Sequence, residues 1–586
     1  MKIKHFFGLA VIAAMTASCS SNEDLGNAGP GTGTNEAGVG YATFTINLPS
    51  VSGTRAADAG GAEMNEGTED EYAVKSATAL IFQKYGADEG SNKFVESVTL
   101  PVDGWTKDAK DDGITTTSKK LVAKLTNVDT KNDYSVLILL NNTKVALPTV
   151  GQSYNDWNSK NILTPSVTDW TGSDGFYMAN APLKGSGASP AILVPINKDK
   201  IYASEAIAKE DASECAATVF VERGVAKMSV ADPTPTDPIK VKDKATKAET
   251  ESTVKFNNWA LDITNKKTYA VHNIDGLESD FGDIWKTDPS NRFIGTNNRV
   301  YWGKDPNYDN KDLKLTDKDA ERQAEFNFIT ATSQIDKDFA NTTKTNPVYC
   351  LENTFNLTNM YQGQTTRVIF KAKYAPKDDA GNSLADDDET FYTIGNMTTI
   401  LNTNKLKAAV NAVANPVLPA GYTIDYTNFM TKEGSHVITL ADIKDADDKP
   451  LVAGTDYSGK TGTVIVDEIN TKLGLTDGGG RAEAKVGINT YLQGVTYYIA
   501  RVKHFGDALT KWNSGESYGD NNKQYLGRYG MLRNNWYELT VGNVYGPGYP
   551  GVPPVDPTLP DDENEKYLSV SVKILSWAKR SQKVDL

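Results

Sequence analysis

Hydrophobic and polar residues alternate strictly near the C-terminal end of the chain. Within the last twenty residues, 567–586, the apolar positions recur at every second residue, with serine and lysine between them. This period of two is typical of a β-strand that buries one face. The apolar positions of this C-terminal strand are Leu568, Val570, Val572 and Ile574, followed by Trp577.

A second run with the same alternation lies near the N-terminus, at residues 41–49. A polar, Gly-containing segment with a single arginine follows it, and such segments are preferred sites of proteolysis. If a cut between Arg55 and Ala56 frees the N-terminal strand, the groove left behind could accept the C-terminal strand of another copy. The pattern therefore predicts a fibre built by strand addition. The apolar positions of the displaced strand are Ala42, Phe44, Ile46 and Leu48.

Further alternating or apolar runs predict a mostly β chain of at least two domains, the first of them an antiparallel sandwich or barrel. Helical spacing is rarer and predicts only a few short helices. A Pro-rich and then charged stretch, 231–253, marks the domain boundary, and a Pro/Gly linker is expected to project the last strand from the body. The alternative is that this strand folds back on its own domain. The predicted strands are 76–85, 119–128, 133–142, a pair within 217–230, a strand around 259–263 and a pair within 489–505, and the predicted helices are 317–334 and 397–413.

The first nineteen residues indicate export. Two lysines, a short apolar run and small residues form a secretory signal that is too short to span a membrane. It ends at Cys19 and is followed by SSNED, which resembles the lipobox of Bacteroidales surface lipoproteins. We expect lipidation of Cys19 and a lipid anchor in the outer membrane, ordinary signal cleavage nearby being the alternative. The expected divisions are a signal (1–19), a tether and cleavable strand (20–55), two β domains (56–232 and 233–550), and a linker with the donor strand (551–586).

The composition and the absence of known motifs argue against nucleic-acid binding, catalysis and metal binding. With 586 residues and a net charge of −14, the chain can bury large cores but has no excess of cationic residues for nucleic acid. The remaining cysteines, Cys215 and Cys350, could pair, although free thiols are the favoured interpretation. Neither a zinc-protease motif nor a phosphate loop is present, and Pro450 occupies the position where a calcium loop needs glycine. We therefore expect no enzyme, no cofactor and no metal.

Several sequence blocks occur in an order that resembles one family. The chain is similar to the major (shaft) subunits of the type V fimbriae of Bacteroidales, in particular their minor, short-fimbria branch. The blocks are FVERGVAKMSV (220–230), NWALDITNK (258–266), YCLENTFN (349–356), TRVIFKAKY (366–374) and GRYGMLRNNWYELTV (527–541), the last followed by GPGYPG.

The resemblance implies a function that agrees with the strand argument. Subunits of this family are exported as lipoproteins and consist of two transthyretin-like sandwich domains. An Arg-specific surface protease removes the N-terminal strand, and donor-strand exchange then builds a head-to-tail filament that supports adhesion and colonisation. The implied partners are other copies of the chain, accessory anchor and tip subunits, the protease, and host or bacterial surface ligands.

Two alternatives remain open at this stage. An accessory tip or anchor subunit would share the fold, although tip subunits generally lack a donor strand and anchors keep the N-terminal strand. A monomeric, carbohydrate-binding surface lipoprotein would use exposed aromatic residues as a sugar platform. The aromatic candidates are Trp512, Tyr518, Trp536 and Tyr545.

Overall fold

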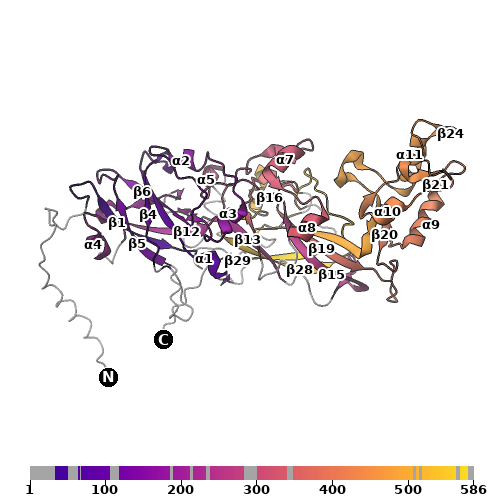
Figure 1. The fold of residues 1–586 in the computed structure, drawn as a ribbon, viewed down its shortest axis with the longest axis horizontal. Helices are drawn as coiled ribbons and strands as arrows, with labels where there is room; N and C mark the ends of the chain where they lie inside the picture. Colours follow the sequence, from indigo (N-terminus) through magenta and orange to yellow (C-terminus); the bar gives the residue numbers. More distant parts are fainter. Residues whose placement is uncertain are drawn as a thin grey trace, which may run out of the picture.

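The molecule is elongated and built mostly from β-strands (Figure 1). Within the described residues strands outweigh helices, which confirms the predicted mostly β fold, while the assignment to transthyretin-like sandwiches stays a prediction. The structure, a computed structural model, describes residues 33–49, 64–65, 67–103, 105, 118–184, 189–210, 215–231, 238–280, 282, 293, 300–338, 347–505, 510–513, 516, 518–562 and 568–577.

An N-terminal sheet occupies one end of the molecule and contains nine of the described strands. These strands are β1 (Gly40–Asn47), β3 (Ala77–Gln83), β4 (Lys93–Leu100), β5 (Ser118–Leu125), β6 (Tyr134–Leu140), β7 (Met178–Asn180), β10 (Val194–Ile196), β11 (Ile201–Tyr202) and β12 (Ala217–Arg223). The main path runs β11, β1, β12, β7, β6, β3, β4, with β5 paired to β1 and β10 to β6. Glu96 on β4 accepts main-chain hydrogen bonds from Thr126 and Asn127 just after β5, so the sheet curls around its core.

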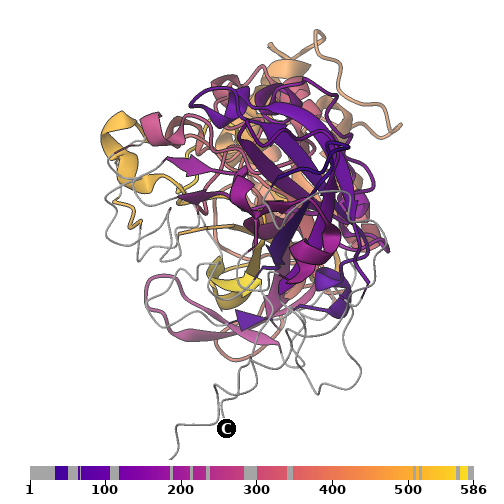
Figure 2. The same cartoon turned by 90° about the vertical axis from the view of Figure 1, so that its left-hand side faces the viewer.

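Short helices and a small hairpin border this sheet. They are α1 (Glu69–Tyr72), α2 (Tyr154–Trp157), α3 (Val167–Thr171), α4 (Glu205–Glu210), β8 (Leu183–Lys184) and β9 (Pro190–Ala191). Seen from this end, the N-terminal sheet lies in front of the rest of the molecule (Figure 2).

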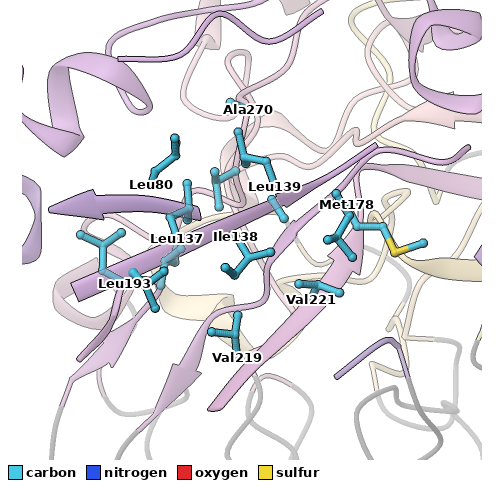
Figure 3. Close-up of a cluster of buried hydrophobic side chains, with 14 of the residues drawn as sticks. Leu80, Leu137, Ile138, Leu139, Met178, Leu193, Val219, Val221 and Ala270 are labelled. Atoms are coloured by element: carbon cyan, nitrogen blue, oxygen red, sulfur yellow. The ribbon is translucent and has the colours of Figure 1, made fainter. Parts of the chain in front are cut away.

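The core of the N-terminal sheet extends beyond the first 232 residues. Ala270 lies among the buried side chains of β6, β7 and β12 (Figure 3), and its carbonyl accepts a 3.0 Å hydrogen bond from the Tyr177 hydroxyl. A β-bridge between Leu163 and Thr268 adds a second link. The first hydrophobic core therefore draws on both sides of the predicted boundary, and the boundary itself stays a prediction.

The chain passes from the N-terminal sheet to the next sheet at Gly224. β12 ends at Arg223, and β13 (Val225–Ala231) begins one residue later in a different sheet. A Cβ at Gly224 would lie 2.7 Å from the ring of Trp170, so glycine is required for this close approach. The predicted strand pair within 217–230 is thus two consecutive strands that do not pair with each other.

A central sandwich follows, formed by two sheets. One sheet has the order β18, β13, β28, β29, β2, and the other has the order β14, β15, β19, β27. Buried residues of both sheets, among them Met228, Phe256, Phe370 and Tyr537, form one core between them. The remaining bounds are β2 (Met64–Asn65), β14 (Ile239–Lys242), β15 (Glu249–Asp262), β18 (Val348–Leu351), β19 (Arg367–Ala375), β27 (Val495–Arg501), β28 (Asn535–Val544) and β29 (Leu568–Trp577).

An end lobe, residues 391–491, lies at the other end of the molecule (orange in Figure 1). It is inserted between β19 and β27 and has a hydrophobic core of its own, which includes Leu406, Val410, Ile465 and Ile469. Its elements are β20 (Phe391–Ile394), α9 (Thr403–Ala414), β21 (Thr423–Ile424), α10 (Thr427–Thr431), β22 (Gly434–His436), β23 (Ile443–Lys444), β24 (Asp456–Tyr457), β25 (Lys460–Thr461), α11 (Gly462–Leu473) and β26 (Ile488–Tyr491).

The helix predictions were partly wrong. The predicted helix 397–413 exists as α9 and begins later, at Thr403. The predicted helix 317–334 is interrupted because Phe326 adopts an extended conformation and pairs with Asn265. The elements of this region are α5 (Leu277–Asp280), β16 (Thr264–Asn265), α7 (Asp319–Glu325), β17 (Phe326–Asn327) and α8 (Thr332–Asp338).

Candidate functional site

The N-terminal strand β1 is a central strand of its sheet. It pairs along its full length with β5 in antiparallel orientation, and on its other side it pairs in parallel with β12 and briefly with β11. The alternate residues Ala42, Phe44 and Ile46 are completely buried, and Leu48 is 2 % exposed. These are the four residues that the sequence pattern assigns to the inward face.

Polar contacts also hold β1 in place. The hydroxyl of Thr43 donates a 2.7 Å hydrogen bond to the carbonyl of Ala208 on α4, and the carbonyl of Thr43 accepts one from the amide of Ala216. A side chain at Gly40 would lie 2.6 Å from a methyl carbon of Ile201, so the neighbouring chain approaches the start of β1 closely. Removal of β1 would therefore open a groove between β5 and β12 that is lined by the N-terminal core.

The two described cysteines are free, as the sequence analysis favoured. Cys215 is half-buried just before β12, with its sulfur 3.1 Å from the hydroxyl of Thr218. Burial alone would raise the pKa of Cys215, but hydrogen bonds with Thr218 and Thr45 hold it below its ordinary value. Cys350 lies in the central core, where burial raises its pKa to about 12.

Three of the predicted modification and processing residues lie outside the described residues. They are the lipidation residue Cys19 and the two residues that flank the expected cut, Arg55 and Ala56. Their roles stay predictions. The next arginine along the chain, Arg223, is completely buried at the end of β12.

The C-terminal strand lies on the central sandwich of its own chain as β29. It pairs with β28 in antiparallel orientation from Leu568, opposite Val544, to Ser576, opposite Asn535, with one irregularity near Val541. All five predicted donor residues therefore belong to a regular strand, and Trp577 at its end pairs with Asn65 on β2. Their function as a donor strand stays a prediction.

The linker before β29 is fastened to the body rather than projecting from it, which corrects the sequence-based expectation. The Arg528 guanidinium binds the Asp562 carboxylate through two nitrogens, at 2.8 and 2.6 Å. The neighbouring Asp561 is buried beside Arg501, and it accepts a hydrogen bond from the hydroxyl of Thr365. Burial raises the pKa of Asp561 to about 7, although Arg501 opposes this shift. Sequence reasoning missed this anchor because DPTLPDDENEK has the composition of a solvated linker.

The aromatic residues considered as a sugar platform do not form an exposed surface. Trp536 and Tyr518 are buried, and Trp512 packs against Tyr518 at a ring distance of 4.7 Å. Tyr545 is half-buried, with the ammonium group of Lys247 over its ring. These side chains serve packing within the body of the protein.

The described part of the chain offers neither a metal site nor a membrane-spanning helix. It contains no group of three or more histidine, cysteine or acidic side chains arranged to hold a metal ion. It also contains no helix that is long and apolar enough to cross a membrane.

Comparison with known proteins gives a fimbrial family match in the C-terminal part of the chain. Residues 489–583 match the family model described as major fimbrial subunit protein type IV, fimbrillin, C-terminal. No curated protein matches the chain. One similar solved structure is a candidate cell adhesion protein from Parabacteroides distasonis, at 10 % identity and a TM-score of 0.37, over 92 % of this chain and 98 % of that chain. Another is a fimbrial assembly protein from the same organism, at 10 % identity and a TM-score of 0.23, over 56 % of this chain and 94 % of that chain.

The family match covers the C-terminal part of the candidate site but not β1. It begins within β26 and includes β27, β28, the Asp561–Asp562 anchor and β29. The match supports a fimbrial subunit, which is a structural protein rather than an enzyme.

Proposed function

We infer that this protein is the shaft subunit of a cell-surface fimbria and that it polymerises by protease-triggered donor-strand exchange. In this proposal a cut after Arg55 releases β1, and the C-terminal strand of another copy fills the groove. Before the cut, a lipid on Cys19 anchors the chain to the outer membrane. The mature fimbria supports adhesion and colonisation together with accessory anchor and tip subunits.

The observation that carries the proposal is the position of β1. This strand completes the N-terminal core from the inside of a sheet, yet the segment that follows it contains the only arginine before Arg223. A strand in this position cannot be removed without leaving an apolar groove that another strand must cover. The C-terminal strand has the same alternation of apolar residues and is therefore suited to cover it.

The burial energies of the two strands are of the right order for a contact between subunits that is stable but can be formed by exchange. Burial of Phe44, Ile46 and Leu48 contributes about 1.5–3 kcal/mol for each side chain. The apolar residues of the C-terminal strand can supply a similar amount in the same groove, less the cost of ordering the strand. Because each copy would offer one groove and one strand, the contact is head-to-tail and produces an open filament.

One observation favours an accessory subunit as the second candidate. In the single chain, β29 lies on its own central sandwich and is paired along most of its length. A subunit that kept this arrangement permanently would end a filament instead of extending it. Such a subunit would act as a tip or an anchor.

The test is digestion of purified full-length protein with an Arg-specific protease, followed by mass spectrometry and negative-stain electron microscopy. We expect a product that begins at Ala56 and forms filaments. Arg55→Ala should remain uncut and monomeric, whereas Arg481→Ala, which removes a partly exposed arginine in the end lobe, should behave like wild type. A copy truncated after Lys566 should be cut but should not assemble by itself. Equal assembly by the truncated copy would overturn the proposal.

A further inference from the structure

A strap, described at residues 64–65 and 67–72, contacts two strands of the five-stranded sheet. At its start, β2 pairs in parallel with the end of β29, Met64 opposite Ser576 and Asn65 opposite Trp577. Six residues later, Glu71 on α1 reaches Lys227 on β13. The strap therefore contacts the outer edge of β29 and an inner strand of the same sheet.

The register of the sheet shows what the strap crosses. Lys227 on β13 lies opposite Trp536 on β28, and Trp536 lies opposite Leu575 on β29. From β13 to β2 there are three strand spacings, or roughly 14–15 Å. Six residues can span up to about 20 Å, so the strap is long enough to pass over β28 and the end of β29.

The anchor of the strap is a buried ion pair. Glu71 is 0 % exposed and Lys227 is 1 % exposed, and a Glu71 oxygen lies 2.8 Å from the Lys227 ammonium nitrogen. Arg223 donates a 2.7 Å hydrogen bond to the main-chain carbonyl of Glu71, and the hydroxyl of Tyr349 donates to its carboxylate. The Lys227 ammonium also lies 3.3 Å from the centre of a ring of Trp536.

The charge state of this anchor follows from its surroundings. Burial alone would raise the pKa of Glu71, but Lys227 and Tyr349 outweigh this effect and lower it. Glu71 is therefore ionised at neutral pH. Breaking such a pair leaves a charge buried without its partner, which makes release of α1 costly. The two-residue ladder between β2 and β29 is a far weaker contact by comparison.

We propose that the strap is a clip that retains the C-terminal strand on its own chain, with Glu71 as the positioning residue that anchors it. The clip determines how readily the end of β29 leaves β28. Release of the clip would make β29 available to another copy of the chain. This step rests on the proposed function. Because Arg55 precedes Met64 by only nine residues in the sequence, a cut there also detaches the clip from β1.

Hydrogen–deuterium exchange of the uncleaved full-length protein tests the clip, with peptides that cover 568–577 as the readout. Two variants release the strap by different routes. Glu71→Gln breaks the ion pair, and the double variant Met64→Pro/Asn65→Pro removes both main-chain donors of β2 while the anchor stays intact. We expect exchange in 568–577 to become faster by about tenfold or more in both variants. Asp70→Asn, which changes the exposed neighbour on the same helix, should match wild type.

The outcomes are distinguishable from those of the filament experiment because exchange is measured on the monomer. If Glu71→Gln fails to fold, the proline variant decides the question alone. Wild-type protection of 568–577 in the proline variant would overturn the clip. Faster exchange in the cut protein, compared with Arg55→Ala after the same protease treatment, would support it. Absence of filaments bears only on the proposed function.

Discussion

At the scale of single residues, burial identifies the side chains on which the N-terminal strand depends. Phe44 is completely buried, whereas Phe220, on the adjacent strand β12 and opposite Asn47, is 37 % exposed. We expect Phe44→Ala to lower the free energy of unfolding of the N-terminal part by about 3–5 kcal/mol through lost contacts and a cavity. Phe220→Ala is the matched control and should cost less than about 1 kcal/mol. Denaturation followed by tryptophan fluorescence would measure both, and equal losses would contradict a central position for β1.

Asp561 should make stability depend on pH. Its pKa is about 7 in the folded protein, against an ordinary value of 3.8. Between these two pH values, the Asp561 carboxyl has lost its proton in the unfolded chain but still holds it in the folded protein. The free energy of unfolding therefore falls as the pH rises from about 4 to 7. The loss at this site is at most about 4 kcal/mol.

The Asp561→Asn variant removes this titration while it keeps the shape of the side chain. We expect its free energy of unfolding to vary less than that of wild type between pH 4 and 7. Urea denaturation at a series of pH values measures the difference. Identical pH profiles for the two proteins would show that Asp561 ionises normally in the folded state.

Sequence reasoning identified apolar residues better than buried polar ones. The four inward residues of β1 followed directly from the period of two. Glu71 lies within TEDEY, which has the composition of a solvated loop, and its partner Lys227 is 156 residues further along the chain. Such a pair depends on tertiary contact, and one sequence contains no local signal for it.

At the scale of elements, alternation identified strands but not their partners. The C-terminal strand was predicted correctly as a strand, and its place beside β28 remained open because a period of two specifies the faces and not the neighbour. The predicted helix 317–334 was partly wrong, because pairing of Phe326 with Asn265 overrides helical propensity and separates α7 from α8. Helix α11 was missed although Thr461 caps its start and Gly474 ends it with a positive φ of 70°.

The end lobe should be removable because it has its own core and its two ends meet. Ile394 on β20 and Ile488 on β26 are direct antiparallel partners, so a two-residue Asn-Gly turn can join them. We expect a variant without residues 395–487, with both isoleucines changed to threonine, to keep the central sandwich folded. Calorimetry should show a smaller enthalpy of unfolding, because the lobe is missing, and a cooperative transition from the rest of the protein. A variant without any cooperative transition would show that the central sandwich needs the lobe.

At the scale of the whole molecule, the two terminal strands occupy different parts of one elongated body. β1 completes the N-terminal sheet, and β29 lies on the central sandwich (Figure 1). Between them, the continuous run from β12 through Gly224 to β13 joins the two sheets. A C-terminal strand that left β28 for the groove of another copy would therefore connect the central sandwich of one subunit to the N-terminal sheet of the next.

Electron cryomicroscopy of filaments grown from the protein cut after Arg55 tests this account most directly. The account predicts that the strand between β5 and β12 in each subunit is the 568–577 segment of a neighbouring subunit, and that β28 has lost its own β29. Filaments in which every groove still holds its own β1, with β29 still paired to β28, would contradict it.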